Sequence, residues 1–174
     1  MSFKYSPQIV TDGLVFAVDA ANPKSYISGD TTCNSLISSN VGTIINTAPN
    51  LSFWDPNNGG SWIFDGTDDM IVGGIFTACD GGSAMTLSAW VKAPTGAQAD
   101  NYAIVLYKAP TNDFGIYQNA SANQLTFRLI TSGGTVTIHG SVGFFDGDWH
   151  HIAGTYDGAN MYFYEDGIQI STAA

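Results

Sequence analysis

Apolar and polar residues alternate with a period of two along much of the chain, which predicts β-strands rather than helices. The alternation is clearest in residues 85–92. One face of that strand would carry Met85, Leu87, Ala89 and Val91, and the other Thr86, Ser88, Trp90 and Lys92. No stretch keeps the 3.6-residue apolar spacing of an amphipathic helix. The pattern therefore favours an all-β fold.

Turn residues separate the alternating runs and predict hairpins. The predicted strand pairs are 125–129 with 136–139 across Gly133-Gly134, 102–108 with 114–117 across residues 110–113, and 161–164 with 168–170 across Asp166-Gly167. The Asp-Gly pair suits a type I′ turn. Residues 22–61 are rich in Asn, Ser, Gly and Pro, and predict a long loop region with one or two short strands. Strands at this spacing indicate an antiparallel β-sandwich or barrel.

Length and composition are those of one globular domain. At 174 residues the chain is most simply a single domain over residues 1–174. Hydrophobic residues make up 44% of it, enough for a sizeable core, whereas charged residues make up only 11%. Since charged residues average about 25% in globular proteins, the surface must be built largely from Ser, Thr, Asn, Gly and backbone.

The charge balance excludes two classes of partner. The net charge is −10, with fourteen Asp and one Glu against four Lys and one Arg. Nucleic acids and anionic membranes both need a basic surface, so neither is an expected partner. No run of about 18 apolar residues occurs, so no membrane span is expected. Lys4, Pro7 and Asp12 interrupt the N-terminal stretch, which therefore predicts no signal peptide and synthesis in the cytoplasm.

Cys33 and Cys79 are the two cysteines of the chain. Neither belongs to a CxxC or His-rich cluster, so no zinc site is expected. A disulfide between them and two free buried thiols both fit the spacing, and two free thiols are the preferred interpretation.

Four motifs occur in order along the chain. They are Asp12–Pro23 (DGLVFAVDAANP), Phe64–Ile71 (FDGTDDMI), Met85–Val91 (MTLSAWV) and Trp149–Gly158 (WHHIAGTYDG), followed by Tyr162 and Asp166-Gly167. Together they resemble the laminin-G-like branch of the concanavalin A-like lectin/glucanase jelly rolls. This resemblance spans residues 12–171 and implies an antiparallel β-sandwich of the jelly-roll kind. The opening residues 5–23 look most like modules on structural proteins of tailed phages.

The resemblance implies a non-enzymatic structural or attachment module of a virus particle, as a capsid decoration or a tail or fibre protein. Its partners would be other virion proteins and further copies of itself, and its location would be the virion. The alternative is a carbohydrate-binding, lectin-like module with glycans as partners and calcium as a candidate aid to binding. The low charge and the lack of a cofactor motif in the sequence fit both classes.

The chain departs from the resembling family near its C-terminus. Family members usually continue past the Asp166-Gly167 hairpin with further strands, whereas this chain ends at Ala174. Either the chain is a fragment that lacks its last strands, or its sandwich closes incompletely. Since an open sheet edge accepts a strand from another chain, Ile168–Ile170 is expected to pair with a neighbouring subunit.

No catalytic residue is predicted. Glycosidases use two carboxylates that flank the scissile bond, and enzymes of the resembling family place a pair of Glu on one strand. Here Glu165 is the single Glu, and its neighbour Asp166 would point to the opposite face. His150 and His151 would also face opposite sides, and a hydrogen-bonded core His is preferred to a catalytic one. His139 receives no role.

Calcium is the one metal for which candidate ligands occur. Asp65, Asp68 and Asp69 lie in one turn, and Asp146, Asp148 and Asp157 lie within twelve residues. The resembling modules often hold calcium at a loop rim with Asp and carbonyl ligands, and Ca²⁺ prefers such oxygens. Asp is also an ordinary turn residue, so solvated turns are preferred and no metal ligand or cofactor is assigned.

Exposed aromatic residues would carry glycan binding by stacking on sugar rings. Trp54, in a loop rich in Asn and Gly, is the best candidate, although a hydrophobic plug under that loop fits it equally well. The strand-like tryptophans, predicted to be core or packed edge residues, are Trp62, Trp90 and Trp149. The tyrosines that fit either role are Tyr156, Tyr162 and Tyr164.

Overall fold

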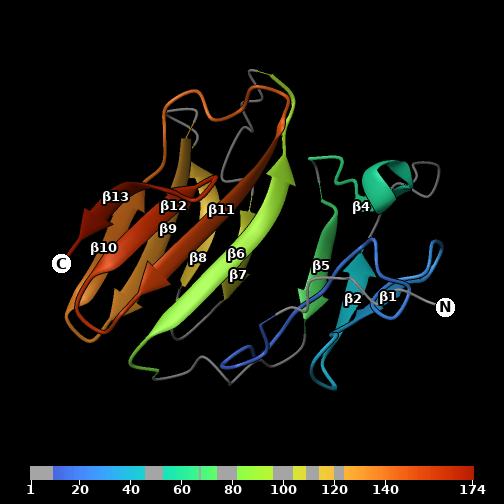
Figure 1. Cartoon of the computed structure of the whole chain (residues 1–174), viewed down its shortest axis with the longest axis horizontal. Helices are drawn as coiled ribbons and strands as arrows, with labels where there is room; N and C mark the ends of the chain where they lie inside the picture. The colour runs from blue at the N-terminus through green and yellow to red at the C-terminus, as the bar shows by residue number, and fades with distance from the viewer. Residues whose placement is uncertain are drawn as a thin grey trace, which may run out of the picture. The chain divides into compact units, whose positions relative to one another are not determined.

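The computed structural model describes residues 10–45, 53–66, 68–73, 82–95, 104–108, 114–119 and 124–174. The chain divides into two compact units, Met1–Ala78 and Cys79–Ala174, and each is considered by itself. Antiparallel strands dominate both units, and the helical structure among the described residues is a single 3₁₀ turn (Figure 1). The predicted all-β, antiparallel class is confirmed, whereas a single domain over residues 1–174 stays a prediction.

The first unit contains a three-stranded sheet and a short hairpin. The sheet has the order β1-β2-β5, with β1 at Thr32–Asn34, β2 at Val41–Ile45 and β5 at Met70–Gly73. The hairpin pairs β3 (Trp54–Asp55) with β4 (Ser61–Trp62) around the 3₁₀ turn η1 (Asn57–Gly59). The prediction of one or two short strands within residues 22–61 is too low. The apolar patches there become strands through pairing with each other and with β5, which local sequence does not reveal.

Cys33 of β1 is a fully buried free thiol. Burial raises the pKa of this thiol, which keeps it protonated and unreactive near neutral pH. Gly42 of β2 packs directly over it, since a Cβ on Gly42 would lie 2.8 Å from the Cys33 Sγ atom. The preference for a free thiol is confirmed for Cys33, while Cys79 lies outside the described residues.

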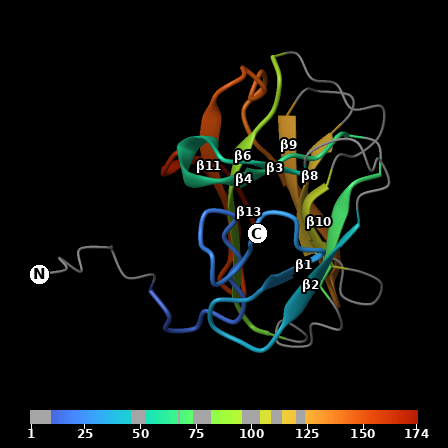
Figure 2. The same cartoon turned by 90° about the vertical axis from the view of Figure 1, so that its right-hand side faces the viewer.

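The second unit is a sandwich of two four-stranded antiparallel sheets (Figure 1). The front sheet, in the order β13-β12-β11-β6, consists of β6 (Met85–Lys92), β11 (Trp149–Tyr156), β12 (Met161–Glu165) and β13 (Ile168–Ala173). The back sheet, in the order β10-β9-β8-β7, consists of β7 (Ile104–Lys108), β8 (Phe114–Asn119), β9 (Gln124–Thr131) and β10 (Gly134–His139). Figure 2 shows the layer with β6 and β11 separated from the layer with β8 and β9.

Alternating side chains of the two sheets fill the space between them. Phe127 of β9 in the back sheet packs in one buried cluster with Ile152 of β11 and Phe163 of β12 in the front sheet. Gly154 of β11 permits this approach, because a Cβ there would lie 2.7 Å from the Phe127 ring. As the alternation predicts, the residues of β6 that pack against the cluster are Met85, Leu87, Ala89 and Val91.

The turns of the sandwich follow their local sequences closely. Asp166 and Gly167 have positive φ angles of 51° and 80°, as both central residues of a type I′ turn require, which confirms that prediction. The β9–β10 hairpin turns at residues 132–133, one residue earlier than predicted, because Gly134 already pairs with Thr131 in the ladder. The predicted strand residues 102–103 and the predicted turn 110–113 lie outside the described residues.

Candidate functional site

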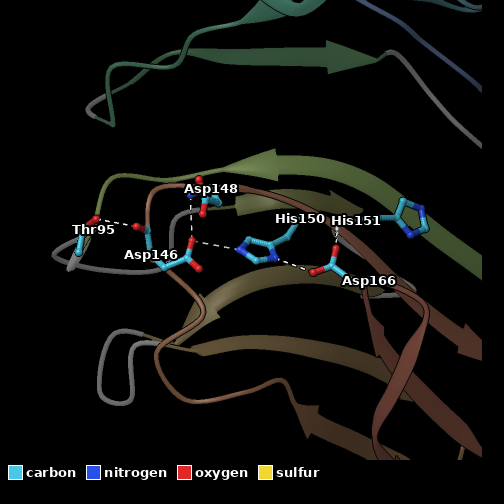
Figure 3. Close-up of polar contacts among 6 residues, drawn as sticks. All are labelled: Thr95, Asp146, Asp148, His150, His151 and Asp166. Atoms are coloured by element: carbon cyan, nitrogen blue, oxygen red, sulfur yellow. Dashed lines mark hydrogen bonds and ion pairs between the residues drawn. The ribbon is translucent and has the colours of Figure 1, made fainter.

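Three segments of the second unit meet around His150: the start of β11, the β12–β13 turn and the loop of residues 140–148 (Figure 3). The His150 Nδ1 atom lies 2.7 Å from Asp166 Oδ2 in the turn, and its Nε2 atom lies 3.1 Å from Asp146 Oδ1 in the loop. Both ring nitrogens therefore face carboxylate oxygens. We call His150, Asp146 and Asp166 the His150 cluster.

Backbone groups hold the two carboxylates of the cluster in place. The backbone N–H of His151 donates to Asp166 Oδ1 at 2.8 Å, and that of Asp148 donates to Asp146 Oδ1 at 2.8 Å. The Thr95 hydroxyl also donates to the Asp146 carbonyl at 2.7 Å (Figure 3). The cluster is therefore positioned by the strand register and the loop, and not by the side chains alone.

His150 and His151 face opposite sides of the front sheet, as predicted. The His150 ring packs against the Phe144 ring at 4.8 Å between centroids, and its side chain is 20% exposed. The predicted hydrogen bonding of this His is confirmed. Its position differs from the prediction, since it lines the rim of the core and not its centre.

The geometry selects the charged form of His150, because only an imidazolium donates from both ring nitrogens. The hydrogen bond to Asp166, followed by that to Asp146, raises the pKa of His150 above its ordinary value. The pKa of Asp166 is lowered, first by the hydrogen bond from His150. The pKa of Asp146 is lowered, first by the hydrogen bond from the Asp148 backbone. Each of these three shifts favours the charged form, so the cluster is an ion triad wherever His150 is protonated.

The stability of the second unit is expected to fall as the pH rises through the folded-state pKa of His150. The pKa of His150 is higher in the folded chain than in the unfolded chain. The cluster therefore stabilises the fold fully at a pH below the unfolded-state pKa, and this stabilisation is lost at a pH above the folded-state pKa. Thermal unfolding across neutral and mildly alkaline pH measures the loss. His150→Gln should flatten this part of the profile, whereas His139→Gln should preserve it. Identical profiles for wild type and His150→Gln would contradict the assignment.

A cavity of about 290 Å³ opens beside the His150 cluster. Glu165 lines it together with the cluster, and the apolar lining residues are Val142, Phe144, Ile168 and Ile170. Glu165 is buried, and its Oε1 atom accepts a hydrogen bond of 2.8 Å from the Ser141 backbone N–H. Gly140 provides the space for this carboxylate, since a Cβ at that position would clash with it.

The outward side of the front sheet carries aromatic residues. We call Trp90, Trp149, His151, Tyr162 and Tyr164 the aromatic face. Trp90 is 66% exposed and lies opposite His151 in the ladder, with 5.4 Å between their ring centroids. Trp149 is 37% exposed, and the two tyrosines of β12 are half-buried. The face therefore presents flat rings with polar edges at the surface.

The exposure of Trp90 corrects its prediction as a core or packed edge residue. Since Ala89 and Val91 point to the core, the period of two turns Trp90 outward. The alternation of residues 85–92 gives this orientation directly, and the apolar character of Trp does not override it. Trp149 lies outward as well, whereas Trp62 is half-buried and packs edge-on against Tyr26 at 5.7 Å, as predicted.

Trp54 is tied to the backbone of the first unit. Its Nε1–H donates to the Ala20 carbonyl at 3.0 Å, and its side chain is half-buried. Gly60 lies so close to the indole that a Cβ atom on Gly60 would be 2.9 Å from Trp54 Nε1. These contacts favour the role of a plug beneath the loop over that of a sugar-stacking platform.

The carboxylates of Asp65, Asp68 and Asp69 gather in the first unit, with ligand atoms within 4.8 Å of one another. The backbone N–H of Asp65 donates to Asp69 Oδ2 at 3.0 Å, and that of Asp68 donates to Asp65 Oδ1 at 3.3 Å. Among the described residues, this is the one group of three or more His, Cys, Asp or Glu side chains whose ligand atoms gather closely enough to hold a metal ion. The preference for a solvated turn over a calcium site stays a prediction here.

The second set of candidate calcium ligands is not brought together. Asp146 and Asp148 precede β11 and Asp157 follows it, so an extended strand of about 25 Å separates them. Asp157 instead accepts hydrogen bonds from the backbone N–H groups of Asn160 and Ala159 at 2.7 and 2.8 Å, which lower its pKa. Asp157 is therefore a turn residue, as the sequence favours.

Glu165 and Asp166 do not form a facing pair of carboxylates. Glu165 is buried on the inner side of β12, while both oxygens of Asp166 are bound by His150 and His151. His139 is exposed, and its Nδ1 atom lies 3.0 Å from the Thr126 hydroxyl. The absence of enzymatic activity stays a prediction.

A laminin G family model, described as the concanavalin A-like lectin/glucanases superfamily, matches residues 64–174, more than half of the chain. The chain belongs to this family. The resemblance drawn from the motifs is confirmed at this level, and the three motifs from Phe64 onward lie within the matched residues. The closer resemblance to tailed-phage modules stays a prediction.

The concanavalin A-like family includes lectins, so the fold allows a carbohydrate-binding module. Among curated proteins, no match to the chain was found. No helix in the described part of the chain has the length and apolar character that crossing a membrane requires.

Proposed function

We propose that this concanavalin A-like domain is a non-enzymatic carbohydrate-binding module that uses its aromatic face. The observation that carries the proposal is the exposed indole of Trp90 beside the His151 ring. Aromatic rings present a large apolar surface that the C–H side of a sugar ring can cover. The Tyr162 and Tyr164 side chains extend that surface with polar groups from β12, which is separated from the Trp90 strand β6 by β11.

The non-enzymatic part of the proposal rests on the carboxylates. Glu165 is the single Glu of the chain, it is buried, and it is held by the Ser141 backbone. Asp166 is engaged by two donors in a turn. Both carboxylates already accept hydrogen bonds from the protein, which supports a role other than that of the paired carboxylates of a glycosidase.

A glycan array probed with the purified chain tests the binding proposal. We expect a restricted set of oligosaccharides to bind, and the same set to quench the fluorescence of Trp90. A folded chain that binds no glycan on the array would contradict the proposal. Release of reducing sugar from a bound oligosaccharide would contradict its non-enzymatic part.

We further propose that the module is carried by a tailed-phage particle, as a capsid decoration or a tail or fibre protein. The resemblance of residues 5–23 and the low content of charged residues support this location. The proposed partners are other virion proteins and a second copy of the chain paired along β13, an edge strand of the front sheet. Ile168 and Ile170 of that strand are 67% and 38% exposed.

Quantitative mass spectrometry of purified particles from the source tests the location. A high fixed ratio to the major shell protein would indicate a capsid decoration, and a few copies per particle a tail or fibre protein. Absence from the particles would contradict the virion proposal and leave the carbohydrate-binding proposal standing. A monodisperse monomer at micromolar concentration would contradict the pairing along β13.

A further inference from the structure

The cavity beside the His150 cluster lies on a different surface from the aromatic face. Its lining residues come from the loop of residues 140–148, from the first residues of β11 and from the β12–β13 hairpin. The aromatic face lies on the outward side of the front sheet, whereas His150 and Glu165 lie on its inward side. The cavity can therefore bind a ligand of its own.

The size and walls of the cavity fit one small ring. Its volume of about 290 Å³ lies at the lower end of the range for ligand pockets, which is enough for a single ring and too little for a chain of them. Phe144, Ile168 and Ile170 form an apolar wall that can contact ring C–H groups. The carboxylates occupy the polar part, as in sites where a few polar groups orient the ligand.

The charge of the cavity favours a cation. Asp146, Glu165 and Asp166 bring three negative charges, and the His150 imidazolium balances one of them. Among the described residues that line the cavity there is no Lys or Arg. The remaining negative charge sits beside low-dielectric protein, where an opposite charge is attracted more strongly than in water.

Two carboxylate oxygens of the cavity are left to accept hydrogen bonds. Glu165 is only 8% exposed, and its Oε1 atom is bound by Ser141, but no group in the described part of the chain donates to its Oε2 atom. Asp146 uses Oδ1 for both His150 and Asp148, and within the same described ranges nothing donates to its Oδ2 atom. Neither oxygen is among the buried polar atoms that lack a partner, so both are open to a ligand from solvent, and an ammonium group supplies three N–H donors.

We infer that this cavity binds an amino sugar, a single sugar ring that carries a free primary amine. The inference rests on the proposed carbohydrate-binding function and names a second subsite for it. The ammonium group is attracted to Glu165 and Asp146, and the C–H side of the ring covers the wall of Phe144, Ile168 and Ile170. A metal ion fits less well, since the close metal-binding geometry among the described residues occurs at Asp65, Asp68 and Asp69 instead.

Methyl NMR of the whole chain during titration with glucosamine tests the inference. We expect saturable shifts of the Val142, Ile168 and Ile170 methyl signals, with the Trp90 indole signal unchanged. Glucose, N-acetylglucosamine and n-butylamine should each bind at least tenfold more weakly. Equal affinity for glucose or N-acetylglucosamine would overturn recognition of the amine, and equal affinity for butylamine would overturn recognition of the sugar ring.

Glu165→Gln provides the matched variant. It keeps the side-chain length and the acceptor for Ser141 but removes the charge, so we expect at least a tenfold loss of glucosamine affinity. Asp148→Asn removes one charge close by but outside the cavity lining, and should leave the affinity within about twofold of wild type. Equal losses in both variants would overturn a local role for Glu165.

The two carbohydrate proposals fail separately. If glucosamine leaves the three methyl signals unshifted while oligosaccharides still quench Trp90, the cavity inference is wrong and the aromatic face stands. If the methyl signals shift and no oligosaccharide quenches Trp90, the aromatic face is wrong. Circular dichroism checks the fold of Glu165→Gln, and if that variant unfolds, the selectivity measured with wild type decides.

Discussion

Trp90→Ala is expected to weaken oligosaccharide binding by about tenfold or more, which corresponds to at least ~1.4 kcal/mol, while the fold stays intact. With 66% of its surface exposed, Trp90 is the most accessible residue of the aromatic face, so truncation removes contact with the ligand and little contact with the core. Surface substitutions of this kind change stability by only about 0.5 kcal/mol. Isothermal titration calorimetry with the tightest ligand from the array measures the affinity.

Trp54→Ala is the matched control for this prediction. Both variants remove an indole, but Trp54 donates its Nε1–H to the Ala20 carbonyl and is half-buried. We therefore expect Trp54→Ala to lower stability and to leave oligosaccharide affinity unchanged. If Trp54→Ala abolished binding and Trp90→Ala did not, the ligand would be bound by the first unit and the aromatic face would be excluded.

Phe127→Ala is expected to cost about 3–5 kcal/mol of unfolding free energy, the range found when a buried Phe is truncated to Ala. Phe127 is fully buried in the sandwich core and contacts Gly154 of the facing sheet. Since domains are stable by only about 5–15 kcal/mol, the variant should be partly unfolded at physiological temperature. Urea unfolding followed by circular dichroism gives the value.

A double-mutant cycle that combines Phe127→Ala with Gly154→Ala tests whether the two residues pack directly against each other. It separates that contact from the general cost of removing a core side chain. The added methyl group would lie 2.7 Å from the Phe127 ring, so Gly154→Ala alone should destabilise by about 1–3 kcal/mol through overpacking. In Phe127→Ala the ring is gone, so the methyl group of Gly154→Ala has room. The double variant should therefore lose less unfolding free energy than the sum of the losses of the two single variants. Additive costs would mean that the two residues do not share a contact.

Strands and turns of the second unit could be predicted because their signals are local. The alternation in residues 85–92 needs no knowledge of partners to show which side chains face the core, and the structure follows it position by position. Asp166 and Gly167 adopt positive φ angles because of their own chemistry. In the first unit, β1 to β4 were underestimated, since such short strands exist through pairing.

The His150 cluster could be predicted only in part. Once Met161–Glu165 is recognised as the strand that pairs with β11, the register brings Asp166 next to His151 and so within reach of His150. Asp146 also reaches the ring, although no local pattern shows how its loop returns. Conversely, Asp157 looked like a neighbour of Asp146 in the sequence and lies at the other end of an extended strand.

The sequence by itself determined the fold class, the family and the inward and outward faces of the main strands, because alternation and turn chemistry act between residues that are close in the chain. Only the tertiary structure decided which polar groups converge. It placed Glu165 in a cavity wall, joined the ring of His150 to two carboxylates and tied Trp54 to a carbonyl 34 residues away. These contacts depend on strand register and loop path, which follow from packing of the whole chain and leave no periodic trace in its residues.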